Sequence, residues 1–461
     1  MDVEILARVQ FALTIMFHYI YPPLSIGLGL VMVIIEGLYL KTRNPLYMQM
    51  AKFWTKVFAL TFAMGVATGV VMEFEFGTNW ATYSRYVGDV FGSALAAEGV
   101  FAFFLESGFL AILLFGWNRV GPKMHFFSTL MVCLGAHFSA IWIVVANAWM
   151  QTPAGFHVVG EGLNARAEIT SFWEMVFNPS AMDRLAHTVI GCWLAGAFLV
   201  ISVSAYYLLK KRHLDFARSS LKVGLTVATI AIVLQGYTGD RSAKIAAKHQ
   251  PAKMAAFEAL YTTTKGAPMA LFGVVNSKEE RIDYAVKVPY LLSWLIHDDP
   301  EAEVTGLDKF PKKDWPNVAV VFQTYRMMIA VWMLMAILCA FSVIMWRRGT
   351  LFESKWMLRA LVGGAILPQI GNQVGWVSAE MGRYPWIVQD LLRISDGLSK
   401  SVTANQVLSS IILFGFVYFI LLLLFIYLLN EKFTHGPSEG DLSSPYHKLG
   451  EHLTTKKETV S

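Results

Sequence analysis

The chain alternates between long apolar stretches and short polar segments, a pattern that predicts membrane-spanning helices. A span needs about 20 predominantly apolar residues. Pro22 and Pro23 should kink the first span near its N-terminal end, and the sixth span is short. The fold class that follows is an all-α, polytopic membrane bundle of about nine transmembrane helices. The nine predicted spans are Phe11–Leu40, Phe53–Phe74, Ala94–Trp117, His125–Trp149, Leu185–Leu209, Val223–Tyr237, Val318–Trp346, Met357–Glu380 and Val407–Leu429.

Lys and Arg gather in alternate connecting segments, near residues 41–56, 119–123, 210–222 and 347–359. Cytoplasmic segments carry the excess of these cations, so we expect the N-terminus outside and the C-terminus in the cytoplasm. The chain then divides into helices 1–6 (residues 1–237), an outer loop (238–317), helices 7–9 (318–430) and a polar, mobile tail (431–461). Within the loop, Ala243–Leu260 is rich in Ala, Lys, Met and Glu and should be helical.

Composition supports a membrane protein and excludes some other classes. Hydrophobic residues make up 55% of the 461 positions and charged residues 15%, whereas soluble domains carry about 25% charged residues. The net charge of +5 is scattered over short loops, which is not a nucleic-acid-binding pattern. The three cysteines are isolated, so neither a disulfide framework nor a zinc site is expected. The first apolar stretch lacks the flanks of a removable signal peptide and is expected to be a permanent span.

Some side chains inside the apolar stretches are ionisable, and at membrane depth such groups mark a functional site by default. His187 lies at the outer end of the fifth span, and Met328 lies about two turns into the seventh. A His/Met pair can hold a six-coordinate, low-spin haem. Arg326, two residues before Met328, can pair with a haem propionate. From spacing alone, a headgroup-level histidine and a gap-filling methionine are the favoured alternative.

His18 lies within the first span and is a candidate ligand of a high-spin haem with an open position. The alternative is a histidine bonded to a backbone carbonyl between helices. Glu98 and Glu106 lie eight residues apart on the third span, which is about 80° and about 12 Å apart on an ideal helix. That spacing suits two stations of a proton relay, with Ser107 and Ser139 as intermediates. The alternative is a pair of carboxylates bonded to their neighbours.

Lys253 and Glu258 lie in the outer loop, five residues apart and too far for an ideal i,i+4 pair. They could flank a quinol head group, with Glu258 taking a hydroxyl proton. The sequence by itself favours the alternative, an ordinary solvated helix face.

Taken with these candidates, several local strings resemble subunit I of the cytochrome bd quinol oxidases, in the form with a short quinol loop. The resemblance covers nearly the whole chain. Within the family, the cyanide-insensitive branch is one group to which the chain can belong. The strings are Arg8–Thr14 with His18, Gly65–Trp80, Tyr86–Asp89, Glu98–Ser107, Ala146–Pro153 and Gly382–Trp386.

The resemblance implies that His187 and Met328 are the axial ligands of a low-spin haem b. It implies that His18 binds one haem of an oxygen-reducing pair, made of a second, high-spin haem b and either haem d or a third haem b. Glu98 and Glu106 match the family's haem-side and proton-path glutamates, and Lys253 and Glu258 match its quinol-loop pair.

Three positions depart from the family pattern. Gln373 stands where members usually carry a glutamate that ligates haem iron, and Gln369 replaces the usual tryptophan. Tyr384 replaces Gln in the Gly-Arg-Gln-Pro-Trp string. An amide has no charge and no titrating proton, and its carbonyl oxygen is a poor iron ligand, so these departures concern the oxygen site above all.

The resemblance implies a quinol:oxygen oxidoreductase subunit of the bacterial inner membrane, electrogenic because quinol protons leave outside and cytoplasmic protons are consumed. It implies subunit II as a partner, with a small single-span subunit as a further one, and ubiquinol or menaquinol and O2 as substrates. One alternative is a divergent relative with an altered dihaem site and another acceptor. An alternative from another class is an ion-coupled transporter, although we find no internal repeat of the kind that transporters often show.

Overall fold

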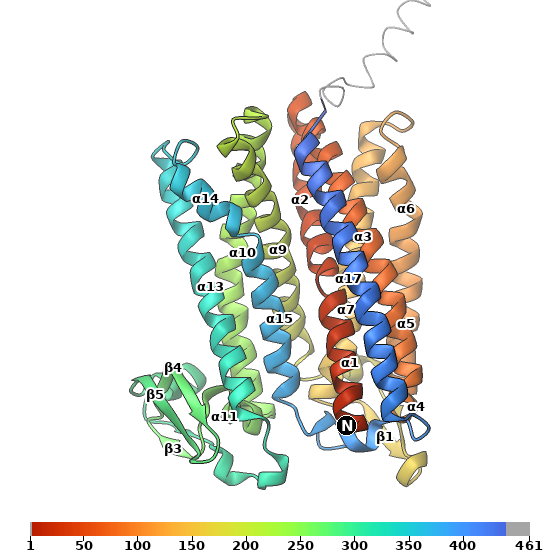
Figure 1. The fold of residues 1–461 in the computed structure, drawn as a ribbon, viewed down its shortest axis with the longest axis vertical. Helices are drawn as coiled ribbons and strands as arrows, with labels where there is room; N and C mark the ends of the chain where they lie inside the picture. Colours follow the sequence, from red (N-terminus) through yellow and green to blue (C-terminus); the bar gives the residue numbers. More distant parts are fainter. Residues whose placement is uncertain (1, 439–461) are drawn as a thin grey trace, which may run out of the picture.

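The apolar stretches fold as helices that lie side by side along one axis (Figure 1). This computed structural model describes residues 2–438. Within that range seven helical segments are long and apolar enough to cross a membrane, where α1 and α2 together count as one. They are α1 (Val3–His18) with α2 (Tyr21–Thr42), α3 (Pro45–Thr78), α7 (Pro122–Gln151), α9 (Ala181–Leu209), α10 (Leu214–His249), α13 (Val318–Arg347) and α17 (Ala404–His435).

The other two predicted spans are built from shorter helices, so the total of nine stays a prediction. The third consists of α5 (Gly88–Glu98), a π-helical turn (Gly99–Phe103) and α6 (Phe104–Phe115). The eighth consists of α14 (Lys355–Gly363) and α15 (Ile366–Met381), which are separated at Gly364. π-helical turns inside α-helices are frequent at functional sites, and this one lies between Glu98 and Glu106.

The kink predicted from Pro22 and Pro23 is present as a break at Tyr19 and Ile20, because proline is accommodated in the first turn of the helix that follows. The helix before the break starts earlier than predicted, at Val3. The break therefore lies within the first span rather than close to its N-terminal end.

Two helices extend beyond the spans predicted for them. The sixth span is not short: α10 continues past Tyr237 to His249, through the first residues that we assigned to the outer loop. The helix predicted over Ala243–Leu260 is the end of α10 followed by α11 (Pro251–Glu258). At the other end of the chain, α17 continues to His435, beyond the predicted start of the tail. Residues 439–461 of the predicted tail lie outside the described part. A helix continues through polar residues as long as its backbone hydrogen bonds do. The apolar pattern therefore predicted helices that were too short.

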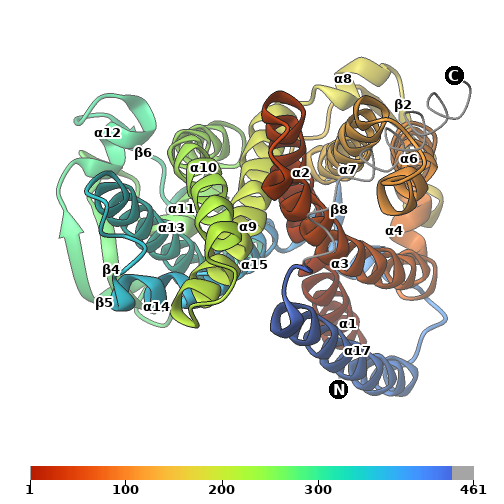
Figure 2. The ribbon, with the colours of Figure 1, turned by 90° about the horizontal axis from the view of Figure 1, so that it is seen from above.

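The helices α2 and α9 cross at the middle of the bundle, with α10 and α13 on one side and α3, α6 and α7 on the other (Figure 2). Gly27 and Gly196 permit this crossing. A Cβ atom added at Gly27 would lie 2.2 Å from the carbonyl oxygen of Cys192, and one added at Gly196 would lie 2.2 Å from the carbonyl carbon of Gly27. Close backbone contact between small residues is a common way to pack membrane helices.

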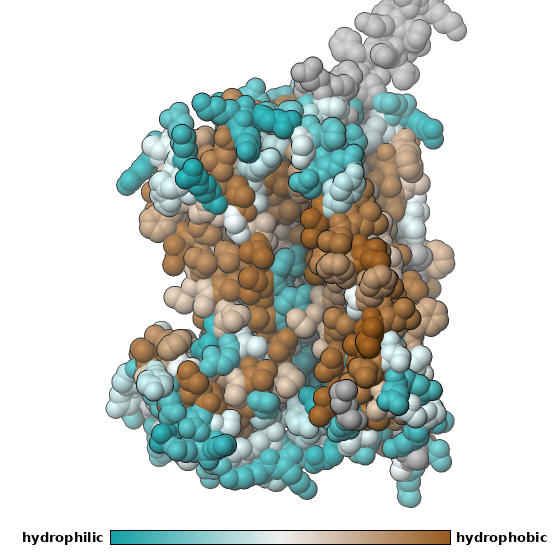
Figure 3. All heavy atoms as spheres, in the orientation of Figure 1, coloured by the Kyte–Doolittle hydropathy of each residue, from teal (hydrophilic) through white to brown (hydrophobic). Residues whose placement is uncertain are grey.

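A wide apolar belt covers the face of the bundle seen in Figure 3, with polar residues at both ends. The N-terminus lies at the same end as the loop between α11 and α13, and α17 finishes at the opposite end (Figure 1). We call these the loop end and the tail end. The loop end also carries four two-stranded antiparallel hairpins or ribbons, which the all-α prediction did not include. They are β1 (Phe156–Val159) with β2 (Arg166–Ile169), β3 (Thr264–Lys265) with β6 (Glu303–Val304), β4 (Met269–Asn276) with β5 (Arg281–Val288), and β7 (Trp386–Val388) with β8 (Leu392–Arg393).

The remaining described elements are short segments in the connections. They are α4 (Ala81–Tyr86), α8 (Phe172–Val176), α12 (Leu291–His297), α16 (Ile394–Gly397) and three 3-10 turns at Gly162–Asn164, Leu307–Lys309 and Lys312–Asp314.

Candidate functional site

His187, on α9, is held by a threonine on α10. Its Nδ1 lies 3.1 Å from the hydroxyl of Thr238, and that hydroxyl donates to the backbone carbonyl of Leu234 at 3.0 Å. Because a carbonyl can only accept, the Thr238 oxygen accepts from Nδ1–H, and the lone pair of the neutral imidazole is on Nε2. The amide of Gln235 donates to that Nε2 at 3.1 Å. His187 is therefore in the tautomer that presents Nε2 as a metal ligand.

The same arrangement recurs at His18. Its Nδ1 lies 2.9 Å from the hydroxyl of Thr68 on α3, and this hydroxyl donates to the carbonyl of Met64 at 2.8 Å. A glycine follows each threonine: Gly69 lies against the His18 ring, and Gly239 lies against the His187 ring. An added Cβ would come within 3.2 Å and 3.4 Å of the respective Cε1 atoms. A partner that fixes the tautomer of a ligating histidine is typical of metal sites.

Met328, on α13, packs against α15. A Cβ atom added at Gly375 would lie 2.9 Å from the Met328 sulfur, so glycine makes room for the thioether. Three residues earlier on α15, Asn372 lies against Gly191 of α9, with 2.7 Å between an added Cβ and Oδ1. The candidate ligands His187 and Met328 therefore lie on helices that both contact α15.

Arg326, which we predicted to pair with a haem propionate, forms a buried ion pair with Glu258 of α11. The pair uses one guanidinium nitrogen, and the other two, Nε and Nη1, have no partner although they are buried. Unpaired buried donors are costly. The guanidinium thus joins the outer loop to α13 and still has donors for an anionic group.

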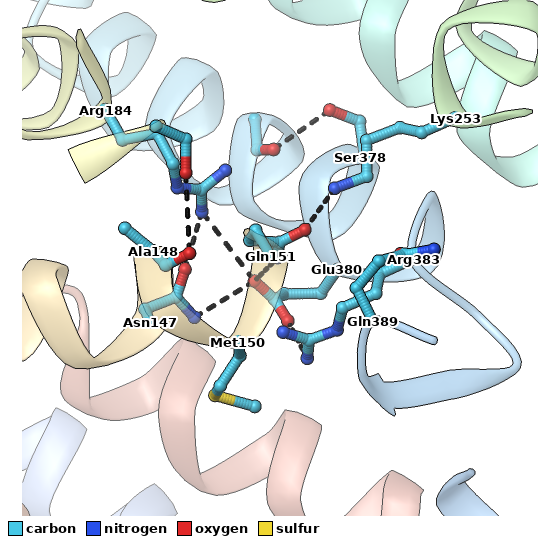
Figure 4. Close-up of polar contacts among 12 residues, drawn as sticks. Asn147, Ala148, Met150, Gln151, Arg184, Lys253, Ser378, Glu380, Arg383 and Gln389 are labelled. Atoms are coloured by element: carbon cyan, nitrogen blue, oxygen red, sulfur yellow. Dashed lines mark hydrogen bonds and ion pairs between the residues drawn. The ribbon is translucent and has the colours of Figure 1, made fainter. Parts of the chain in front are cut away.

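A second cluster of charges lies where α7, α9, α11 and α15 meet at the loop end (Figure 4). Glu380 accepts from Arg383 at 2.6 Å, from Asn147 at 3.1 Å and from Gln151 at 3.2 Å. Arg184 donates to Asn147 at 2.5 Å and lies 4.0 Å from Glu380. The Arg184 Nε and the Arg383 Nη1 are buried without a partner. Like Arg326, this cluster has cationic hydrogen-bond donors that are not used within the protein.

Lys253 extends the cluster into the outer loop. Its Nζ donates to Gln151 and, at 2.9 Å, to Gln250 (Figure 4 shows the contact with Gln151). Burial lowers the pKa of Lys253 well below its ordinary value, and Arg184 and Arg383 act in the same direction while Glu380 opposes them. The side chain is 3% exposed, so the solvated helix face considered from the sequence is wrong.

Glu258 is also buried, at 4% exposure, and its Oε1 has no partner. Burial raises the pKa of this carboxyl, and Arg326 partly opposes the effect. Lys253 and Glu258 thus belong to one short helix but to two separate polar clusters. A carboxyl with a raised pKa and an open oxygen can accept a proton from a hydroxyl that reaches it.

Gln369 and Gln373 both bond to the break between α1 and α2. The amide of Gln373 donates to the carbonyl of Met16 at 2.7 Å, and that of Gln369 donates to the carbonyl of Ile20 at 3.3 Å. The Met16 carbonyl lacks its usual helical partner, because the Ile20 N–H bonds to Phe17 instead. A carboxylate could not donate this bond. The amide at position 373 therefore supports the backbone two residues before His18.

Glu98 and Glu106 lie on either side of the π-helical turn. Glu98 accepts from the hydroxyl of Ser139 at 2.9 Å, as the predicted relay requires. Glu106 is 6% exposed and its Oε1 is buried without a partner. Gly135 of α7 lies against it, 2.8 Å from an added Cβ to the Glu106 Cβ. The alternative, in which both carboxylates are hydrogen-bonded to their neighbours, fits Glu98 but not Glu106.

Comparisons with known proteins decide the family. The sequence profile of the cytochrome bd terminal oxidase subunit I family matches residues 6–437. The chain belongs to this family. It is 38% identical over 443 residues to the cytochrome bd ubiquinol oxidase subunit 1 of Bacillus subtilis (strain 168), covering 94% of each chain. It is 33% identical over 515 aligned positions to the cytochrome bd-II ubiquinol oxidase subunit 1 of Escherichia coli (strain K12), covering 97% of this chain and 100% of the relative.

The fold agrees with that assignment. The bd oxidase of Geobacillus thermodenitrificans superposes with a TM-score of 0.88 at 30% identity, over 95% of this chain and 99% of that one. As a cytochrome bd subunit I, the chain is a multi-pass membrane protein and part of an oxidoreductase, and membership of the family implies haem cofactors.

The residues present fit haem at the His187 side of this cytochrome bd subunit. The histidine has its lone pair on Nε2, where the Gln235 amide now donates. The thioether of Met328 has a glycine opposite it, and buried guanidinium nitrogens are unpaired. At the His18 side the histidine fits equally well, but the carboxylate expected at position 373 is an amide engaged with the backbone. No group of three or more His, Cys, Asp or Glu side chains is arranged for a free metal ion within residues 2–438.

Sequence reasoning gave no role to several residues that complete the site. Glu380, Arg184 and Arg383 form its charged cluster, and Thr68 and Thr238 orient the two histidines. A Thr-Gly dipeptide, inside the second predicted span and again directly after the sixth, was the available indication. The sequence alone did not show that each dipeptide lies beside a histidine, because that contact depends on the fold.

Proposed function

We propose that this chain is the haem-carrying subunit of a quinol:oxygen oxidoreductase that oxidises quinol at the loop end and reduces O2 to water. The observation that carries the proposal is the pair of clusters beside His187 and Met328, each with buried, unpaired guanidinium nitrogens. Haem, when bound, supplies one-electron chemistry and a site for oxygen. The family membership sets aside the ion-coupled transporter.

His187 and Met328 would hold a low-spin haem b, with Arg326 and Arg184 donating to its propionates. This requires the Gln235 amide to turn away from Nε2, a movement that breaks no hydrogen bond at the unpartnered Oε1 of Gln235. His18 would hold one of the two remaining haems, a high-spin haem b and either haem d or a third haem b. Thr68 keeps its Nε2 free for iron.

Quinol would bind at the loop end, against α11. Glu258 takes a hydroxyl proton, because burial raises its pKa and one of its oxygens is open. Lys253 supplies a second polar contact through an amine whose pKa is lowered by burial. The substrate is ubiquinol or menaquinol, since both present two hydroxyls para to each other on an aromatic ring.

At the tail end, protons for water formation would pass Glu106 and then Glu98, which Ser139 holds in place. The loop end faces outward and the tail end faces the cytoplasm of a bacterium, with the chain in the inner membrane. Quinol protons released outside and protons consumed from the cytoplasm make the reaction electrogenic. Subunit II is the expected membrane partner, with a small single-span subunit as a further one, and no nucleic acid is involved.

One observation favours a second candidate function, in which the altered dihaem side serves another electron acceptor. Gln373 donates to the Met16 carbonyl and provides no anion. Oxygen uptake by the purified complex with quinol as donor decides between the two. Uptake of one O2 for every two quinols oxidised supports the oxidase, and quinol oxidation by another acceptor without oxygen uptake supports the alternative.

The quinol site is tested by changing the electron donor. Glu258→Ala should lose quinol-driven oxygen uptake but keep uptake driven by a phenylenediamine, which delivers electrons without the loop. Removing Glu258 leaves Arg326 unpaired in a buried place, which is strongly destabilising, so Glu258→Gln is measured beside it. The exposed loop variant Glu301→Ala is the matched control. Equal loss of both activities in Glu258→Gln would refute a role of Glu258 in quinol oxidation.

A further inference from the structure

One face of α7 carries a row of side chains that can donate or accept protons, and the mechanism above does not use them. His125, Thr129, Cys133 and His137 follow each other at intervals of four residues, which is about 6 Å per step along an α-helix. His125 and Thr129 are 1% exposed and Cys133 is 6% exposed. The row runs from the tail end of α7 to the middle of the bundle.

At the tail end the row meets a buried carboxylate on α2. Glu36, which is 3% exposed, lies 2.6 Å from Nδ1 of His125 and accepts from the hydroxyl of Thr129 at 2.5 Å. Nε2 of His125 lies 3.2 Å from the carbonyl of Leu113, so Nε2 carries a hydrogen and Nδ1 faces the acid. An acid and a base thus share a proton between helices α2, α6 and α7.

The pair is close to the tail-end surface. The ring of Trp117, in the connection after α6, lies 3.7 Å from the His125 ring between centroids. The Nζ of Lys52 on α3 lies 6.0 Å from the Trp117 ring. Trp117 is half-buried, so the ring that lies against His125 reaches the surface at the tail end.

Packing alone does not explain this pair. Removing two ionisable groups from water costs more than their attraction usually returns, and apolar side chains of similar volume hold helices together at least as well. Ionisable groups inside a membrane mark proton or ion pathways by default. A histidine and a glutamate in contact are also suited to passing protons, because each can take one up and release one.

The deep end of the row lies beside Glu106. Gly135, between Cys133 and His137 on α7, is in contact with Glu106, whose Oε1 is buried and unpartnered. Cys133 lies 3.7 Å from His137, and the indole of Trp193 donates to His137 at 2.9 Å. The step from Thr129 to Cys133 is one helical turn, about 6 Å, and a proton would cross it over a bridging water molecule.

We propose that Glu36, His125 and Thr129 form the proton-uptake station of this protein, and that it feeds Glu106 by way of Cys133. The inference rests on the proposed function, in which Glu106 delivers protons for oxygen reduction. In each cycle one proton enters the pair from the tail end and one leaves toward Glu106, so the charge of the pair is unchanged. The residues of the station are separate from every candidate haem ligand.

The test uses the assembled oxidase in lipid vesicles, with a pH dye on the tail-end side. Fully reduced enzyme is mixed with oxygen, and proton uptake and haem oxidation are followed in the same sample. The variants are Glu36→Gln, His125→Asn, Thr129→Val, Cys133→Ala and Cys133→Ser. The matched control is Ser128→Ala, because Ser128 is fully buried on the same helix, bonds only to the Met124 carbonyl and lies off the row.

We expect Glu36→Gln, His125→Asn and Thr129→Val to slow proton uptake at least about tenfold, since a positioned proton-transfer group contributes a factor of that size or more. The reduced haem spectra should match the unmodified protein. Cys133→Ala should slow uptake and Cys133→Ser should not, because the hydroxyl also relays a proton. Ser128→Ala should leave uptake unchanged.

The contrary results are equally definite. Uptake at the unmodified rate in Glu36→Gln and His125→Asn would overturn the station, and the pair would then only fasten α2 to α7. The same result in Cys133→Ala would overturn the link to Glu106. If Glu36→Gln does not assemble, Thr129→Val decides, because it removes one hydroxyl and no charge. Haem spectra and quinol-driven oxygen uptake of the unmodified protein test the proposed function separately.

Discussion

Single side chains set the chemistry around His18. Thr68 holds the imidazole tautomer, Gly69 makes room for the ring, and Gln373 donates to the backbone just before it. The family's usual carboxylate at position 373 could bind iron but could not donate to the Met16 carbonyl. With glutamine at position 373, the protein lacks a possible iron ligand and gains a hydrogen bond that supports the helix break.

Restoring the carboxylate tests that exchange. Gln373→Glu should change the high-spin haem spectrum and make it pH-sensitive, while the low-spin bands stay fixed, because a charge-assisted contact is about twice as strong as a neutral one. Gln369→Glu, one turn away, is the control for a new charge at the same break. If Glu98 has taken over the role, Gln373→Glu will do little and Glu98→Gln will abolish the high-spin bands. No spectral change in any of these variants would place both residues away from the iron.

The loop-end carboxyl makes quinol oxidation depend on pH. Glu258 must be deprotonated to take a proton, and burial raises its pKa above the ordinary 4.5. Quinol-driven turnover should therefore fall as the pH drops through a midpoint above 4.5. Arg326 lowers this pKa, so Arg326→Gln should move the midpoint to higher pH. A pH profile of initial rates measures it, with Glu301→Gln as the exposed control; an unmoved midpoint in Arg326→Gln would contradict the assignment.

Among the helices, α15 joins the parts of the site. Gly375 lies against Met328, Gln369 and Gln373 bond to the break before α2, and Glu380 anchors the charged cluster at the loop end. Because these contacts come from one short helix, a shift of α15 would change the surroundings of both Met328 and His18.

The crossing of α2 and α9 should be the least tolerant packing contact. Gly196→Val would place side-chain atoms where the Gly27 backbone lies, since an added Cβ already comes within 2.2 Å. Overpacking typically costs about 1–3 kcal/mol and can cost more, so we expect a marked fall in the thermal midpoint of the purified complex. Gly363→Val is the control, because an added Cβ at Gly363 has nothing within 4 Å. Equal midpoints for the two variants would show that α2 and α9 do not depend on this contact.

Element boundaries show what the sequence can and cannot specify. The break after His18 was predictable because proline acts locally on the backbone. The length of α10 was not, since apolar pattern alone cannot tell a helix that leaves the membrane from one that ends there. The pairing of Arg326 with Glu258 joins residues 68 positions apart, and the Glu36–His125 pair joins residues 89 apart. Contacts of that kind depend on the packing of whole helices.

At the scale of the whole molecule, two kinds of chemistry lie at opposite ends of one bundle. The buried Lys253 and Glu258 lie at the loop end, and the Glu36–His125 pair lies near the tail end, with the candidate haem ligands on the helices between them. Such a separation is what an enzyme needs if it is to release protons on one side and take them up on the other. We expect electrons from quinol to reach the other haems by way of a haem held by His187 and Met328.

The most direct test is a dithionite-reduced minus oxidised absorption spectrum of the purified complex and of two variants. The unmodified protein should show low-spin haem b bands together with high-spin bands. His187→Ala and Met328→Ala should each lose the low-spin bands and keep the high-spin ones, with the protein still inserted in the membrane. A His187→Ala spectrum identical to that of the unmodified protein would contradict the account.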